Sequence, residues 1–298
     1  EVHRSIQAVK VRGRQHSDQI VSLKITDEGI QFFPKINFPL KYTATTNRVS
    51  TGLSVLDEMF YGGVFRGSST LVSAATGTGK TLLSLHFLLE GLQNNEPCLY
   101  LGFEESRDQV IRNASTVGWN LEAYEKKGLL VLRCMTPDEK LLEEHLSDVR
   151  KIVEEKKIQR CSVDSLSSIS IGIPKDHFTS FSRRLNGFLK KQEVTSIFTT
   201  TTPSLTGLGV LSEAQISTAS DNIISLRCVE IAGELSVVLN ILKQRGSAQS
   251  KDLRQYEITE KGITIGASLA GYEGVVTGTT RKVAASTEDM IEAEFKSV

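Results

Sequence analysis

The sequence lacks the features that would place the chain in a membrane or an oxidising compartment. No apolar run approaches the roughly 20 residues that span a bilayer, and no signal peptide is recognisable at the start. The cysteines have neither metal-binding nor redox spacing; they are Cys98, Cys134, Cys161 and Cys228. We therefore predict a cytoplasmic protein with reduced thiols and no membrane partner.

The sequence also lacks an excess of charge of either sign. It contains 35 Lys and Arg residues and 35 Asp and Glu residues among 298. No overall field therefore attracts the chain to nucleic acid. The length suits one large domain or two small ones.

A strand, a glycine-containing loop and a helix are predicted in succession between Ser69 and Leu92. Gly77 and Gly79 allow successive N–H groups to turn towards a phosphate. In the phosphate-loop motif the lysine reaches the β- and γ-phosphates and the threonine holds Mg²⁺. The first motif position carries Ala74 instead of glycine, and the alternative is a plain strand-to-helix turn. The predicted ATP-binding residues are Thr76, Gly77, Thr78, Gly79, Lys80, Thr81 and Leu82.

Beyond this loop, short apolar strands alternate with helical patterns. This alternation is typical of an α/β fold with a mainly parallel sheet and helices on both faces. Three later strands joined by short turns predict an antiparallel extension. The expected strands are 98–103, 129–134, 161–164, 196–200, 222–229, 235–242 and 254–258, and the expected helices are 107–117, 138–157 and 177–191.

Three carboxylates follow predicted parallel strands, where ligands bind in such sheets. Glu104 and Glu105 close one strand, and either can orient or deprotonate a water or hydroxyl. Their alternative is a pair of solvated acids before the helix at Ser106. Asp164 ends another strand and suits the water shell of Mg²⁺. The small polar residues of 165–168 are consistent with the floor of a site.

Lys243 and Arg245 lie near the end of a predicted strand, far in sequence from the phosphate loop. Alternate residues of a strand point to the same face. Two cations on one face can clamp a γ-phosphate, either the chain's own or a neighbour's. The alternative is a charged edge that protects a sheet from aggregation.

Part of the sequence recurs at a constant offset of 233 positions. Between 10–30 and 243–263, eight of 21 aligned residues are identical, including the pattern Lys-x-Arg-Gly. Internal repeats indicate duplicated structural units. We therefore predict three parts. Residues 1–46 are the end of a preceding ATPase repeat plus a linker, residues 47–268 are an ATPase and kinase domain, and residues 269–298 are a flexible regulatory tail.

These motifs together resemble the second ATPase half of the KaiC family of clock ATPases, over about 48–265. The matching segments are 74–81, 103–106, 164–167, 216–218 and 243–246. The resemblance implies a RecA-like P-loop fold and a homohexameric ring with ATP and Mg²⁺ at each interface. It also implies autophosphorylation of Ser217 and Thr218 and in-trans ATP contacts from Lys243 and Arg245. Glu104 becomes the general base, with Glu105 beside it and Lys80 on the phosphates.

Three functions remain open on this resemblance. The first is a serine/threonine autokinase and ATPase in a circadian oscillator, with KaiA/KaiB-like partners. The second is a signalling or stress-response ATPase of the same type, which acts through protein partners without a daily rhythm. The third is a RecA-type DNA-dependent ATPase, which needs cationic loops that face DNA. The segment 199–222 contains no Lys or Arg, and this argues against nucleic acid.

Overall fold

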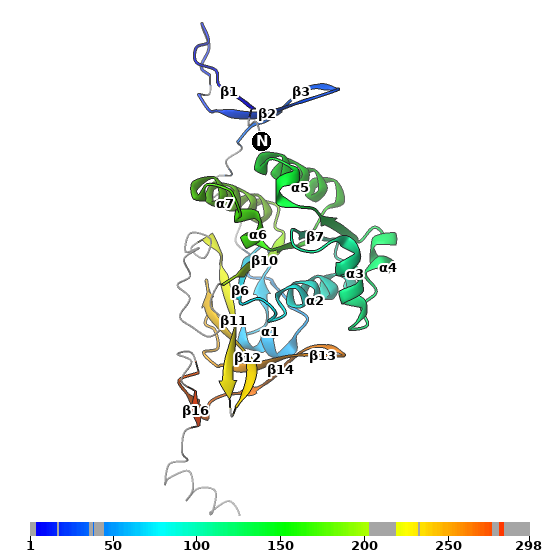
Figure 1. The fold of residues 1–298 in the computed structure, drawn as a ribbon, viewed down its shortest axis with the longest axis vertical. Coiled ribbons are helices and arrows are strands. Elements are labelled where there is room, and N and C mark those ends of the chain that lie inside the picture. The colour runs from blue at the N-terminus through cyan, green and yellow to red at the C-terminus, as the bar shows by residue number, and fades with distance from the viewer. Residues whose placement is uncertain are drawn as a thin grey trace, which may run out of the picture.

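The structure is a computed structural model. It describes residues 4–16, 18–35, 38, 45–202, 219–231, 233–275 and 280–282. One sheet with helices on both faces forms the body of the molecule, and a small separate sheet lies next to the N-terminus (Figure 1). Within the described residues, no helix is long and apolar enough to cross a membrane.

Nine strands form the main sheet. They are β6 (Ser69–Ala74), β7 (Cys98–Gly102), β8 (Leu130–Cys134), β9 (Arg160–Asp164), β10 (Thr195–Thr201), β11 (Asn222–Ile231), β12 (Glu234–Gln244), β13 (Arg254–Thr259) and β14 (Gly262–Ser268). Their order is β14-β13-β12-β11-β6-β10-β9-β7-β8. The six strands from β11 to β8 are parallel, and β12, β13 and β14 are antiparallel. This confirms the predicted parallel sheet with its antiparallel extension.

Helices cover both faces of this sheet because its buried strands alternate their side chains between two apolar clusters. In β7, Cys98 and Tyr100 belong to one cluster, and Leu99 and Leu101 belong to the other. The first cluster packs against α1 (Ser54–Met59), α2 (Lys80–Gln93), α3 (Arg107–Ser115) and α4 (Leu121–Lys126). The second packs against α5 (Leu142–Lys156), α6 (Leu166–Ser170) and α7 (Lys175–Lys191). A two-stranded ribbon of β4 (Arg48–Val49) and β5 (Val64–Phe65) flanks α1.

The structure divides the helix predicted at 138–157. A short 3₁₀ helix, η1 (Pro137–Glu139), precedes α5, and Lys140 between them is extended with a φ of −143°. The Glu139 carboxylate accepts the backbone N–H of Thr136 at 2.9 Å. This capping interaction confines the first turn to η1, so that it does not continue into α5. The prediction of one continuous helix was wrong for this reason.

The four cysteines are free thiols. Cys98 and Cys161 are buried in the core. Burial raises the pKa of the Cys98 thiol to about 12, so this side chain behaves as a small apolar group.

The repeated sequence forms the same hairpin twice. The N-terminal sheet contains β1 (Arg4–Ile6), β2 (Val21–Thr26) and β3 (Gly29–Phe33). Thr26 pairs with Gly29 in this sheet, and Thr259 pairs with Gly262 at the offset of 233 in the main sheet. Each threonine hydroxyl donates to the carbonyl of its glycine, at 3.2 Å and 3.0 Å. The assignment of residues 1–46 to a preceding ATPase repeat remains a prediction.

The beginning of the predicted tail contains secondary structure. β15 (Tyr272–Glu273) pairs with β16 (Arg281–Lys282), and Val275 is buried against Val229 and Val238. The described part of 269–298 is therefore partly packed on the end of the sheet. Residues 276–279 and 283–298 lie outside the described residues, and the flexible regulatory character of the tail stays a prediction.

A buried ion pair joins the two long helices of one face. Arg184 of α7 donates through both terminal nitrogens to Glu143 of α5, with an Nη2 to Oε1 distance of 2.6 Å, and both side chains are nearly inaccessible. Removing one partner of such a pair leaves a buried charge. We expect Arg184→Ala to lower the free energy of unfolding by about 3–5 kcal/mol in chemical denaturation. The exposed neighbour gives the control, since Arg183→Ala is expected to change it by less than about 0.5 kcal/mol. Equal losses in the two variants would contradict the prediction.

Candidate functional site

The phosphate loop lies between the buried strand β6 and the first residue of α2. Gly77 and Gly79 have φ values of 80° and 90°, in the region that favours glycine. A Cβ added at Gly79 would lie 2.6 Å from the Ile258 side chain of β13. The backbone conformation thus favours glycine at position 79, and a larger residue would also have to displace the end of the Ile258 side chain. Ala74 ends β6 in the core with 1% exposure, so the departure from the motif falls on a residue inside the strand.

The lysine of the phosphate loop is hydrogen-bonded to the backbone of the same loop. Lys80 Nζ donates to the Ala75 carbonyl at 3.1 Å, and the Thr78 hydroxyl donates to the same carbonyl at 2.8 Å. Burial lowers the pKa of Lys80, and the charges of Glu104 and Asp164 oppose that shift. Thr76 and Gly77 are exposed at the tip of the loop. The ammonium group therefore lies between the loop and two carboxylates, as a phosphate-binding lysine requires.

Asp164 is the most fully hydrogen-bonded carboxylate of the site. It ends β9 with 2% exposure. Its Oδ2 accepts the Thr81 hydroxyl at 2.6 Å and the Tyr100 hydroxyl at 2.9 Å, and its Oδ1 accepts the Thr199 hydroxyl. Burial and the adjacent Asp164 charge raise the pKa of Tyr100 well above its usual value, so Tyr100 stays a neutral donor. Hydrogen bonds from α2, β7 and β10 thus hold the Asp164 carboxylate in place.

Glu104 follows β7 and faces the small polar helix α6. Its Oε1 accepts the Ser168 hydroxyl at 2.6 Å and also accepts the Ser165 hydroxyl. Ser165 directly follows Asp164, and the strand register places Gly102 opposite Asp164. Glu104 and Asp164 therefore extend from the carboxyl ends of adjacent strands, next to the phosphate loop. The small polar residues of 165–168 form part of the site floor, as the sequence indicated.

Glu105 points to different partners from those of Glu104. Its Oε2 accepts the Asn113 side-chain amide of α3 at 3.0 Å. Partial burial, followed by the charges of Asp164 and Glu104, raises the pKa of Glu105, and the Asn113 hydrogen bond opposes that shift. The two adjacent carboxylates thus differ in environment, and only Glu104 lies against α6.

The raised pKa of Glu105 makes a pH-dependent contribution to stability. The native carboxyl binds its proton more tightly than the unfolded one, so stability falls as the pH rises from the unfolded pKa through the folded pKa. Glu105→Gln removes this loss and keeps an acceptor for Asn113. We expect a melting temperature higher by on the order of 1 °C at pH 8, with no gain at pH 4. Equal shifts at both pH values in thermal unfolding would contradict this assignment.

Lys243 and Arg245 lie towards the opposite end of the strands from the phosphate loop. Ile223 pairs with Lys243 on one side and with Leu71 of β6 on the other, so the cations lie beside the first half of β6. The loop follows the last residue of β6, about 16 Å from its first residue at the usual strand rise. This topology separates the two cations from a nucleotide on their own loop.

These two cations are held in place by the residues that precede β11. Lys243 Nζ donates to the Ser220 carbonyl at 2.6 Å, and the Arg245 backbone N–H donates to the Asp221 carbonyl at 3.0 Å. The Arg245 guanidinium is 4.0 Å from the Asp221 carboxylate and about half exposed. Burial and the adjacent Arg245 charge lower the pKa of Lys243. Ser217 and Thr218 lie outside the described residues, which resume at Ala219.

Two residues of the site were not predicted from the sequence. They are Tyr100 and Thr199, which hold Asp164 from β7 and β10. The only indication in the sequence was that Tyr100 lies within the apolar run at 98–103. A tyrosine hydroxyl that is buried needs a hydrogen-bond partner. The partner itself is 64 positions away in the sequence.

The donors around Thr81 fit the expected Mg²⁺. Mg²⁺ prefers oxygen ligands and keeps several of its waters, and the Thr81 hydroxyl and the Asp164 carboxylate supply oxygen atoms beside the phosphate loop. Over the ranges that the structure describes, no group of three or more His, Cys, Asp or Glu side chains forms a separate metal site.

Comparison with known proteins identifies the family. The family described as "ATPase: KaiC" matches residues 49–270. The chain is 38% identical over 295 residues to the circadian clock oscillator protein KaiC of Picosynechococcus sp., which covers 99% of the chain and 57% of that protein. It is 40% identical over 280 residues to the KaiC of Thermosynechococcus vestitus, which covers 94% of the chain and 54% of that protein.

The chain thus spans just over half the length of these relatives. The matched region contains the phosphate loop, the three carboxylates and the two distant cations. The parallel sheet, its antiparallel extension and this match confirm the predicted RecA-like P-loop fold. The chain belongs to the KaiC ATPase family.

Proposed function

We propose that this chain is the second ATPase half of a KaiC-type protein that binds ATP, hydrolyses it and phosphorylates itself on Ser217 and Thr218. The carrying observation is the pair of carboxylates, Glu104 and Asp164, on adjacent strands beside Lys80. Family membership supports ATP as the nucleotide. The assignment of Ser217 and Thr218 as phosphoacceptors rests on the resemblance of the sequence to the family.

The residues divide the chemistry between them. Backbone N–H groups of 76–82 bind the phosphates, and Lys80 balances their charge. Thr81 and Asp164 would hold Mg²⁺, which would supply positive charge beside the phosphates. Glu104 accepts the proton of the acceptor hydroxyl as the new oxygen–phosphorus bond forms and ADP leaves. The Ser165 and Ser168 hydroxyls orient Glu104 for this transfer.

The remaining cations act across a subunit contact in this proposal. A homohexameric ring brings Lys243 and Arg245 of one subunit to the nucleotide of the next. This is supported by the position of Lys243 and Arg245, which lie towards the end of the strands away from the phosphate loop of their own chain. In a ring, each subunit uses two different surfaces, so every interface joins one loop to one cation pair.

A role in a circadian oscillator, with KaiA/KaiB-like partners, is part of the same proposal. It is supported by relatives named as circadian clock oscillator proteins. An ATPase that signals through other protein partners uses the same site, and it differs from the clock protein in having no daily rhythm. Since each added phosphate carries about −1.5 to −2 charges, it can reshape a subunit contact.

Mass spectrometry after incubation with Mg-ATP tests the proposal. We expect phosphate on Ser217 or Thr218 in the purified chain. Lys80→Ala serves as the control and is expected to carry none, because its loop cannot hold the phosphates. Steady release of ADP with both residues unmodified would show that the chain hydrolyses ATP and would contradict the proposed kinase activity.

A further inference from the structure

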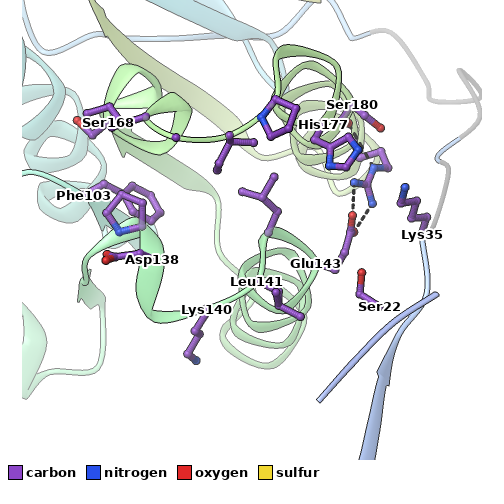
Figure 2. Close-up of a pocket in the computed structure, with 17 residues that line it drawn as sticks. Ser22, Lys35, Phe103, Asp138, Lys140, Leu141, Glu143, Ser168, His177 and Ser180 are labelled. Atoms are coloured by element: carbon purple, nitrogen blue, oxygen red, sulfur yellow. Dashed lines mark hydrogen bonds and ion pairs between the residues drawn. The ribbon is translucent and has the colours of Figure 1, made fainter. Parts of the chain in front are cut away.

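A cavity of about 660 Å³ lies apart from the phosphate loop. Its walls come from η1, the start of α5, the segment 171–174 and α7. Ser22 of β2 and Lys35 of the linker after β3 close one side (Figure 2). None of residues 74–82 lines it, and neither Glu104 nor Asp164 does. Its volume is in the range of small-molecule sites, which often lie where two structural units meet.

One end of the cavity is cationic. Lys35 of the linker and His177 of α7 lie at this end (Figure 2), and Arg184 also lines the cavity. Glu143 neutralises Arg184 through two contacts. Within the described residues, neither Lys35 nor His177 has a hydrogen-bond or ion-pair partner. Two donors therefore remain available to an anionic group.

The middle of the cavity is apolar. Its lining includes Leu141, Ile171, Ile173 and Pro174, and Ile171 is 77% exposed. An apolar body in contact with these side chains would remove apolar surface from water, at about 25 cal/mol per Å². The cavity thus offers apolar contacts along its length and charge at one end.

The other end of the cavity adjoins the general base of the proposed function. Phe103 and Ser168 line it. Phe103 directly precedes Glu104 in the sequence, and the Ser168 hydroxyl donates to Glu104 Oε1 at 2.6 Å. A molecule that fills this end would touch Ser168, the residue whose hydroxyl donates to Glu104.

We propose that this cavity is an effector site for a small amphipathic anion, with its carboxylate, sulfonate or phosphate at Lys35 and His177 and its apolar body against 171–174. Its occupant changes the Ser168–Glu104 hydrogen bond and so alters the rate of ATP turnover. The effect on turnover rests on the proposed function, whereas binding does not.

Fluorescence titration of the full chain with 8-anilinonaphthalene-1-sulfonate tests the binding. We expect saturable binding of one probe per chain. The double variant Lys35→Glu/His177→Glu is expected to weaken it by about tenfold, because two attractive contacts become repulsive. Lys175→Glu is the matched control, since it changes a cation of the same helix outside the cavity. Binding that is unchanged in the double variant, or equally weakened in the control, would overturn the site.

ATP turnover with and without the probe tests the coupling. Turnover of the unmodified chain without probe is measured first and reports on the proposed function alone. We expect the probe to change this turnover by at least about twofold and to have no effect in Ser168→Ala, which lacks the connecting hydroxyl. A bound probe that leaves turnover unchanged in the unmodified chain would overturn the coupling, whatever the basal rate.

Discussion

Glu104→Gln is expected to reduce phosphate incorporation into the chain by about 100-fold to 10,000-fold, the usual contribution of a general base. ATP binding is expected to survive, because the phosphate loop, Lys80 and Thr81 are unchanged. The amide still accepts the Ser165 and Ser168 hydroxyls but takes up no proton at neutral pH. The variant therefore separates binding from chemistry.

Two observations select Glu104 over Glu105 as the base. The charges of Glu104 and Asp164 oppose the burial that lowers the pKa of Lys80, and the Ser165 and Ser168 hydroxyls hold Glu104 at the end of its strand. Glu105 is tied instead to Asn113 of α3. In the phosphate-loop motif the lysine contacts the γ-phosphate. A carboxylate close to Lys80, such as Glu104, would therefore also lie close to a bound γ-phosphate.

Incorporation of labelled phosphate and binding of a fluorescent nucleotide measure the two effects. Glu105→Gln is the matched control, with the same chemical change one residue away, and it should keep most of the incorporation. If Glu104→Gln incorporated phosphate at the rate of the unmodified chain, a residue other than Glu104 would have to be the general base. Loss of nucleotide binding in Glu104→Gln would show that the carboxylate supports the loop instead.

The sequence predicted the elements whose patterns are long or whose chemistry is local. The strand, loop and helix around 69–92 follow from glycine positions and an apolar helix, and the order of alternating elements determines a parallel sheet. Two helices beyond the phosphate loop were not predicted. α4 and α6 span six and five residues, too few for a helical period to be recognised. They form because capping residues and the adjacent core hold them.

The strand ends and the loop that carry the proposed site residues were predictable, but the partners of those residues were not. Glu104, Asp164 and Lys80 follow from their places after strands and in the loop. Tyr100 and Thr199 were missed because they meet Asp164 only when β7, β9 and β10 are neighbours. In the same way, a strand pattern shows that Lys243 and Arg245 share a face, but only the pairing of β11 with β6 determines which end of the sheet they occupy.

The position of Arg245 gives the second large expected effect. Arg245→Ala is expected to reduce ATP turnover and phosphate incorporation by about 1,000-fold, as for an arginine that stabilises transferred phosphate. Lys251→Ala, an exposed cation in the loop that follows β12, is the control and should have little effect. The fold should tolerate the change, because the guanidinium is about half exposed and the Lys190–Asp221 ion pair remains.

Mixing experiments distinguish action on the neighbour's nucleotide from action on the chain's own. Arg245→Ala subunits keep an intact loop, and Lys80→Ala subunits keep an intact Arg245. In a ring assembled at random from equal amounts, about one quarter of the interfaces join an intact loop to an intact arginine. Those interfaces should recover activity that neither variant has alone. Failure of rescue at every mixing ratio, with rings of mixed composition verified by native mass spectrometry, would contradict chemistry shared across an interface, since the sheet already separates Arg245 from its own loop.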